Sequence, residues 1–138
     1  MFVKKLNNNA ILPLKGSSGS AGYDVFSCED KILLPKTRSL ISTGISISID
    51  AKDFYIRIAP RSGMAVKGID VGAGVVDLDY RGEVKVLLIN NSDSKYTIDY
   101  GDRIAQLIIE KIYMLDVINT SELDETDRGS GGFGSTGK

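Results

Sequence analysis

The chain has 138 residues, of which 42% are hydrophobic, which is the size and composition of a single globular domain. Its 17 basic and 18 acidic side chains give a net charge of -1, which provides no general field for binding polymeric nucleic acid. The chain has no histidine and one cysteine, Cys28, which excludes histidine-based catalysis, an intrachain disulfide and a thiolate zinc site.

Short β-rich runs, separated by Gly, Pro, Asn, Asp and Ser, predict a chain of strands. In residues 43–50 (TGISISID) isoleucines alternate with serines, the period-2 pattern of a half-buried strand. Further runs lie at 40–44, 54–59, 82–90 and 96–100. Residues 103–112 (RIAQLIIEKI) also fit a helix, but their β-branched content favours a strand. Residues 61–68 have room for one short helix at most. We therefore expect an all-β sandwich or barrel.

The composition changes after Leu115, through acidic SELDETD into glycine-rich RGSGGFGSTGK. Such a segment cannot pack a core, so we expect a single β domain over 1–120 and a flexible arm over 121–138. Residues 132–138 satisfy the pattern GxxxxGK of a phosphate-binding P-loop. That interpretation is rejected, because neither the following Ser/Thr nor a following helix is present.

Five segments concentrate glycine, carboxylate, arginine and hydroxyl residues that neither strand pairing nor core burial requires. They are SAGYDVFS, APRSGMA, GVVDLDYRGE, GDRIAQLI and RGSGGFGSTG. Without histidine, a general base must be a carboxylate, Lys, Tyr, Cys or a metal-bound group. Asp77 and Asp79 lie on one side of the third segment if it is extended, but from this segment alone an acidic turn at a hairpin tip is the favoured explanation.

The other segments also permit a structural and a functional interpretation. Asp24 fits either a turn aspartate or a ligand, next to a tight backbone at Gly22. Ser62 follows the strand-ending Pro60 and fits either a helix cap or a phosphate contact at a helix start. From the residues alone, these alternatives stay open.

Together, in this order and at this spacing, the five segments resemble the motifs of the trimeric dUTP pyrophosphatase (dUTPase) family. The resemblance runs from about residue 21 to residue 137. It implies a distorted jelly-roll or barrel-like subunit of a homotrimer, with active sites that draw residues from all three subunits. It also implies hydrolysis of dUTP to dUMP and pyrophosphate with Mg²⁺, which keeps uracil out of DNA and supplies dUMP for thymidylate synthesis.

The resemblance assigns roles on the base and sugar. It makes Asp77, and not Asp79, the catalytic base that activates water for attack at the α-phosphorus. Tyr80 packs beneath the deoxyribose and excludes a ribose hydroxyl. The remaining contacts to base and sugar are assigned to Gly74, the backbone of Lys85, and Phe133.

The resemblance also assigns the phosphate and metal contacts. Asp24 holds Mg²⁺ through water, and the arm orders when substrate binds. The residues that it places on the phosphate chain are Arg61, Ser62, Gly63, Gln106, Arg128, Gly134, Ser135 and Thr136. Asp102 and Arg103 are interpreted as structural. Met64, Val76 and Lys85 depart from the common pattern without touching the proposed chemistry.

Two rival functions remain at this stage. One is a dCTP deaminase of the same fold, with or without dUTPase activity. The other is a catalytically silent nucleotide-binding or regulatory trimer, which the presence of Asp77, Tyr80 and Phe133 disfavours. No apolar run suits a membrane span or a signal peptide, so we expect an intracellular protein, cytoplasmic or also nuclear, with no membrane or nucleic-acid partner.

Overall fold

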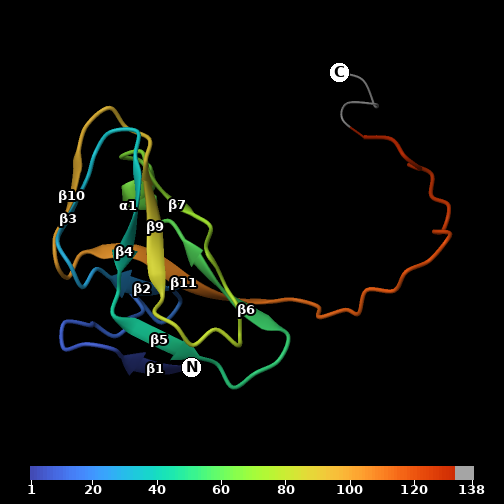
Figure 1. The fold of residues 1–138 in the computed structure, drawn as a ribbon, viewed down its shortest axis with the longest axis horizontal. Helices are drawn as coiled ribbons and strands as arrows, with labels where there is room; N and C mark the ends of the chain where they lie inside the picture. The colour runs from blue at the N-terminus through green and yellow to red at the C-terminus, as the bar shows by residue number, and fades with distance from the viewer. Residues whose placement is uncertain (133–138) are drawn as a thin grey trace.

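The computed structural model describes residues 1–132, and almost all of its regular structure is β (Figure 1). The one helix described has four residues, so no helix in this part of the chain is long and apolar enough to cross a membrane. The elements are β1 (Phe2–Lys5), β2 (Tyr23–Phe26), β3 (Lys31–Leu33), β4 (Arg38–Ser42), β5 (Ile45–Ser48), β6 (Phe54–Ala59), α1 (Ser62–Ala65), β7 (Ile69–Gly72), β8 (Val75–Val76), β9 (Lys85–Asn90), β10 (Tyr96–Ile98) and β11 (Arg103–Lys111).

The strands form two larger antiparallel sheets and two strand pairs. One sheet has the order β2-β11-β6-β8 and the other has the order β4-β9-β7, while β1 pairs with β5 and β10 with β3. Among residues 1–132 the sheets do not close into a barrel. The all-β prediction is therefore confirmed in its jelly-roll-like form.

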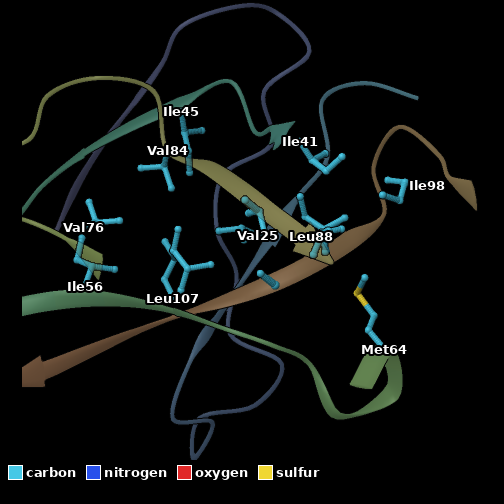
Figure 2. Packing of buried hydrophobic residues seen from close by; sticks show 14 of the residues in the cluster. Val25, Ile41, Ile45, Ile56, Met64, Val76, Val84, Leu88, Ile98 and Leu107 are labelled. Carbon is cyan, nitrogen blue, oxygen red and sulfur yellow. The ribbon is translucent and has the colours of Figure 1, made fainter. Parts of the chain in front are cut away.

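The core lies between the two larger sheets, where their inward side chains meet (Figure 2). Val25, Ile56 and Leu107 come from the four-stranded sheet, and Ile41 and Leu88 from the three-stranded sheet. All five side chains are buried, and burial of large aliphatic side chains is the main force that holds such sheets together. The packed sheets thus form a rigid support for the loops at their edges.

The ambiguous run near the C-terminus forms β11, the longest strand, so the strand prediction is confirmed. It lies at the centre of its sheet, between β2 and β6. As a strand, this segment forms hydrogen bonds with partners on both sides and buries its apolar face against the core. These interactions stabilise the strand relative to a helix. Residues 61–68 hold one short helix, α1, as predicted.

The strand predicted over 43–50 is shorter, and one of its faces differs from the prediction. β5 spans Ile45–Ser48, and Ser46 is only 7% exposed, although the alternation predicted that the serines face solvent. The hydroxyl of Ser46 donates a hydrogen bond of 2.8 Å to the carbonyl of Arg81, which allows this polar side chain to be buried. The predicted half-buried strand is therefore wrong at Ser46.

The third motif segment lies in a long excursion between β7 and β9. These strands pair antiparallel, with Gly72 opposite Leu87, so they are the arms of a hairpin. Between them, β8 leaves that sheet and pairs with β6 of the other sheet. The connection between the two arms, residues 73–84, thus reaches both sheets and is not a tight hairpin turn.

The chain leaves the folded body after Lys111 and runs outward through residue 132 (Figure 1). Large apolar side chains in this stretch are exposed to solvent, among them Tyr113, Met114, Leu115, Val117 and Ile118. Exposed apolar side chains in such a density are typical of a segment that packs against another molecule.

Candidate active site

One cleft of about 560 Å³ contains the predicted catalytic base together with three of the four residues predicted to bind base and sugar. Gly74, Asp77, Tyr80 and Lys85 line it, next to apolar side chains such as Leu87. A concave site with apolar walls and a few polar groups is the usual form of a small-molecule site. We call this cleft, lined by residues 72–77, 80, 83–85 and 87 with Leu40 and Ile58, the slot.

Gly74 fixes the back of the slot against β6. Its carbonyl accepts a hydrogen bond of 2.7 Å from the amide of Ile58, and its φ of +104° lies where side chains are strained. A Cβ at this position would stand 2.7 Å from the Ile58 carbonyl oxygen. Only glycine therefore allows β8 to approach β6 in this way.

The structure separates the two acidic residues that the sequence pattern left equivalent. The segment turns after Asp77, with a hydrogen bond of 3.1 Å from the amide of Tyr80 to the carbonyl of Asp77, so it is not extended. Asp77 is exposed and lines the slot. Asp79 instead lines a neighbouring cavity with Phe54 and Tyr55, which Asp77 also borders. Of the two carboxylates, Asp77 is the one that faces the slot.

The Tyr80 side chain packs against the loop that follows it, residues 82–83. Its hydroxyl donates a hydrogen bond of 3.0 Å to the carbonyl of Glu83. Its ring covers Gly82 so closely that a Cβ there would overlap the phenol atoms. Tyr80 is 46% exposed, which leaves part of its ring free to support a ligand.

A second group of predicted residues meets around Asp24 on β2. The Asp24 side chain is 17% exposed, and one carboxylate oxygen pairs with Nε of Arg61 at 3.0 Å. Its other oxygen lies 3.4 Å from Nη1 of Arg103. The Arg61 guanidinium also donates to the Arg103 carbonyl at 3.1 Å. We call Asp24, Arg61, Arg103 and Gln106 the charged cluster.

Arg103 is the residue of this cluster that the sequence analysis missed. It was interpreted as structural together with Asp102. In the structure Asp102 accepts a hydrogen bond of 3.0 Å from the amide of Asp99 and closes the turn before β11. Arg103 instead reaches Asp24 on the neighbouring strand. The order of strands in the sheet, which sequence does not give, brings the two together.

Gln106 joins the cluster through the register of the central sheet. It stands opposite Asp24 on β2 and Ala59 on β6, and its amide donates a hydrogen bond of 3.0 Å to the Pro60 carbonyl. A Cβ at Gly22 would lie 2.6 Å from the Gln106 side-chain oxygen. Gly22 therefore leaves the space that the Gln106 side chain occupies.

Ser62 and Gly63 are exposed at the start of α1, beside the charged cluster. The N-cap residue is Arg61, and no side chain caps the helix, so the capping interpretation of Ser62 is wrong. The first N–H groups of a helix have no partner within it. This turn can thus offer a hydroxyl and main-chain donors next to Arg61.

Within residues 1–132, no group of three or more Cys, Asp or Glu side chains lies close enough to hold a metal ion. Asp24 offers a single carboxylate, partly accessible, between two arginines. A lone carboxylate fits Mg²⁺, which keeps most of its water and commonly binds through substrate phosphates as well. The donor set therefore fits an ion that binds together with a phosphorylated ligand.

The slot and the charged cluster lie at different places in the chain's own fold. The slot is formed by the connection between β7 and β9, and the cluster by β2, β11 and the start of α1. None of the cavities described over residues 1–132 is lined by both Asp77 and Arg61. Within one chain, the predicted residues thus gather in two separate places.

Arg128, the one predicted arm residue within residues 1–132, joins neither part in this chain. It lies in the segment after β11, where its Nε donates a hydrogen bond of 2.9 Å to the Gly131 carbonyl. The predicted residues Phe133, Gly134, Ser135 and Thr136 lie outside the described residues.

A hydrogen-bonded group lies on the outer face of β6 and β11, where Tyr55 lines the cavity next to the slot. The Tyr55 hydroxyl donates to one oxygen of Glu110, and Nε of Arg57 lies 2.6 Å from the other. The bond from Tyr55, and then that from Arg57, lowers the pKa of Glu110. The same bond raises the pKa of Tyr55. This group therefore favours an ionised Glu110 beside a neutral Tyr55.

Comparisons with known proteins agree with these observations. The dUTPase family model matches residues 8–137. The chain is 55% identical over 136 residues to a deoxyuridine 5'-triphosphate nucleotidohydrolase of Arabidopsis thaliana, covering 98% of this chain and 81% of the plant protein. It is 54% identical to the protein of that name from Paramecium bursaria Chlorella virus 1, covering 99% and 97%. A mutant dUTPase of Staphylococcus bacteriophage 80alpha, solved with dUpNHpp, has a TM-score of 0.90 at 28% identity, covering 99% and 98%.

Proposed function

The chain belongs to the dUTPase family, and we propose on that premise that Asp77 is the base of its hydrolytic reaction. The enzyme is a dUTP diphosphatase, which splits dUTP into dUMP and pyrophosphate. The observation that carries the assignment is the meeting of Asp77, Tyr80 and Gly74 in one slot of nucleoside size. Asp77 is exposed and lines the slot, so its carboxylate can reach a water molecule beside a bound nucleotide and act as a general base.

The slot selects the base and the sugar. Main-chain groups of the loop around Gly74 and Lys85 pair with the hydrogen-bonding edge of uracil, and a base with the wrong pattern leaves them unpaired. An unpaired buried group costs about 1–3 kcal/mol, which is enough to reject cytosine. The Tyr80 ring lies under the deoxyribose and leaves no space for a 2′-hydroxyl.

The charged cluster receives the triphosphate. Arg61, with the first turn of α1, supplies positive charge and hydrogen-bond donors for phosphate oxygens. Asp24 would hold Mg²⁺ through water, and the bound ion supplies charge neutralisation on the phosphate chain. Gln106 lies next to Asp24 in register and contributes an amide to the same ligands.

Hydrolysis then proceeds in one step, without a covalent enzyme intermediate. Asp77 orients a water molecule and takes its proton as the water oxygen attacks the α-phosphorus in line. The bond between the α-phosphorus and the bridging oxygen to the β-phosphate breaks, and pyrophosphate leaves with that oxygen. The positive groups of the cluster stabilise the charge that develops on the leaving phosphates.

The complete site requires three copies of the chain. In one subunit the slot and the charged cluster border different cavities, and the arm as far as residue 132 runs away from the folded body (Figure 1). In a homotrimer the slot of one subunit meets the cluster of a second. The arm of a third subunit covers both, with Phe133 on uracil and Arg128, Gly134, Ser135 and Thr136 on the phosphates. The exposed apolar stretch 113–118 would be buried in this assembly.

The reaction serves two ends in an intracellular setting, cytoplasmic or also nuclear. Removal of dUTP keeps uracil out of DNA, and the dUMP formed supplies thymidylate synthesis.

Pyrophosphate release from dUTP, dTTP, dCTP and UTP tests the proposal. We expect fast release from dUTP alone, together with a trimeric mass in light scattering. Ammonia released from dCTP would instead identify a deaminase, and binding of dUTP without turnover would identify a silent nucleotide-binding trimer.

A further inference from the structure

Two buried hydroxyl side chains lie under the slot, and the proposed reaction uses neither of them. Thr43 is 1% exposed and Ser46 is 7% exposed. Burial of a hydroxyl costs free energy unless the hydroxyl is hydrogen-bonded. The partners of these two groups therefore indicate which part of the structure they stabilise. Both hydroxyls donate to main-chain carbonyls of residues 81–84, which are distant in sequence.

We call residues 43–46 the anchor segment. Four hydrogen bonds join this segment to residues 81–84. The Ser46 hydroxyl donates to Arg81 at 2.8 Å, and the Thr43 hydroxyl donates to the carbonyl of Val84. The amide of Gly44 donates to the Glu83 carboxylate at 2.9 Å. The fourth bond runs from the amide of Val84 to the carbonyl of Ile45, at 2.8 Å. Residues 81–84 are therefore held against the anchor segment by three bonds that involve side chains and by one bond between main-chain groups.

Tyr80 takes its position from this fastened loop. Its hydroxyl donates to the Glu83 carbonyl at 3.0 Å, and its ring covers Gly82. The Glu83 side chain is 23% exposed, with one oxygen on Gly44 and the other 3.5 Å from the ammonium of Lys85. A movement of Glu83 would therefore move the carbonyl that holds the Tyr80 ring.

We propose that the anchor segment and Glu83 are positioning residues for Tyr80, and that they set the discrimination between deoxyribose and ribose substrates. The inference rests on the proposed function, in which the Tyr80 ring packs beneath the deoxyribose. Exclusion of one hydroxyl group depends on sub-ångström placement of the excluding surface, and such placement requires supporting residues that are themselves fixed. Thr43 and Ser46 supply that support from outside the slot lining, and Glu83 supplies it at the slot wall through its bond to Gly44.

The test measures kcat/KM for dUTP and for UTP in variants of the full chain. Glu83→Ala removes the bond to Gly44, and Thr43→Val removes the bond to Val84 with little change of shape. We expect each to lower the dUTP-to-UTP ratio about tenfold or more, chiefly through a gain in UTP turnover. Glu83→Gln should restore the ratio, because its amide oxygen still accepts from Gly44.

Ser27→Ala is the matched control. Ser27 is fully buried, and its hydroxyl donates 2.6 Å to the Glu29 carbonyl, away from the slot. This variant loses a bond of the same kind, so it should melt at a lower temperature but keep the wild-type ratio. If Glu83→Ala does not fold, Ser46→Ala makes the same test, because it removes only the bond to Arg81.

Tyr80→Ala separates the two levels of the proposal. A wild-type ratio in Tyr80→Ala would overturn the sugar role of Tyr80 and with it this part of the proposed function. A lowered ratio in Tyr80→Ala, with wild-type ratios in Glu83→Ala and Thr43→Val, would overturn the positioning role alone.

Discussion

Substitution of Gly74 by alanine should destabilise the protein and damage the slot together. At φ of +104°, alanine enters a backbone region that costs of order 1–3 kcal/mol. Its Cβ would also stand 2.7 Å from the Ile58 carbonyl oxygen, so the strands must separate and the bond from Ile58 to Gly74 weakens. Loss of that bond adds about 1 kcal/mol, which gives a total of roughly 2–4 kcal/mol.

The free energy of unfolding, measured by urea denaturation at fixed protein concentration, tests this magnitude. Gly19→Ala is the matched control, because its Cβ would meet no atom within 4 Å and its φ lies outside the strained range. The control should stay within about 0.5 kcal/mol of the wild type. The reasoning is refuted if Gly74→Ala unfolds at the wild-type urea concentration with an unchanged slope.

Three further predictions concern the charged cluster, the outer face of the sheet and the arm. Gly22→Ala should displace the Gln106 side chain and lower kcat/KM for dUTP at least tenfold, measured by pyrophosphate release, whereas unchanged kinetics would remove Gln106 from the site. The hydrogen bond from Tyr55 lowers the pKa of Glu110 in the folded protein. The ionised Glu110 therefore stabilises the folded state fully above about pH 4.5, its ordinary pKa, and this stabilisation is lost as the pH falls through the lowered pKa of the folded protein. Urea curves of wild type and Glu110→Gln should therefore differ at pH 7 and converge on acidification, and a constant difference would contradict this. Deletion of residues 128–138 should leave a trimer in light scattering but abolish most dUTP hydrolysis, and an active truncated enzyme would refute the arm model.

The strands were predictable wherever apolar side chains repeat with a strong local pattern. Residues 54–59 and 103–112 match β6 and β11 closely, because β-branched side chains and burial favour the same state. Ser46 was misjudged for a physical reason. The alternating pattern depends only on the polarity of each side chain. It cannot show that the Ser46 hydroxyl donates a hydrogen bond to a carbonyl 35 residues away in the sequence.

The sequence motifs identify individual candidate site residues. They do not show that these residues separate into the slot and the charged cluster within one chain. The motif segments identify Asp24, Arg61 and Gln106, which the sheet register then brings together. Arg103 was missed, because its partner is fixed by the neighbouring strand and not by nearby sequence. Local pattern likewise could not distinguish Asp77 from Asp79, since that depends on the turn between them.

The rate of the Asp77→Asn variant tests the central claim most directly. Asparagine keeps the shape of the side chain and cannot accept the proton of the attacking water at neutral pH. We expect dUTP binding, measured by calorimetry, to stay within a few-fold of the wild type while kcat falls about 10²–10⁴-fold. Asp79→Asn, which changes the carboxylate that lines the neighbouring cavity, should keep most turnover. Near-normal turnover in Asp77→Asn would contradict the account, because the base would then lie elsewhere.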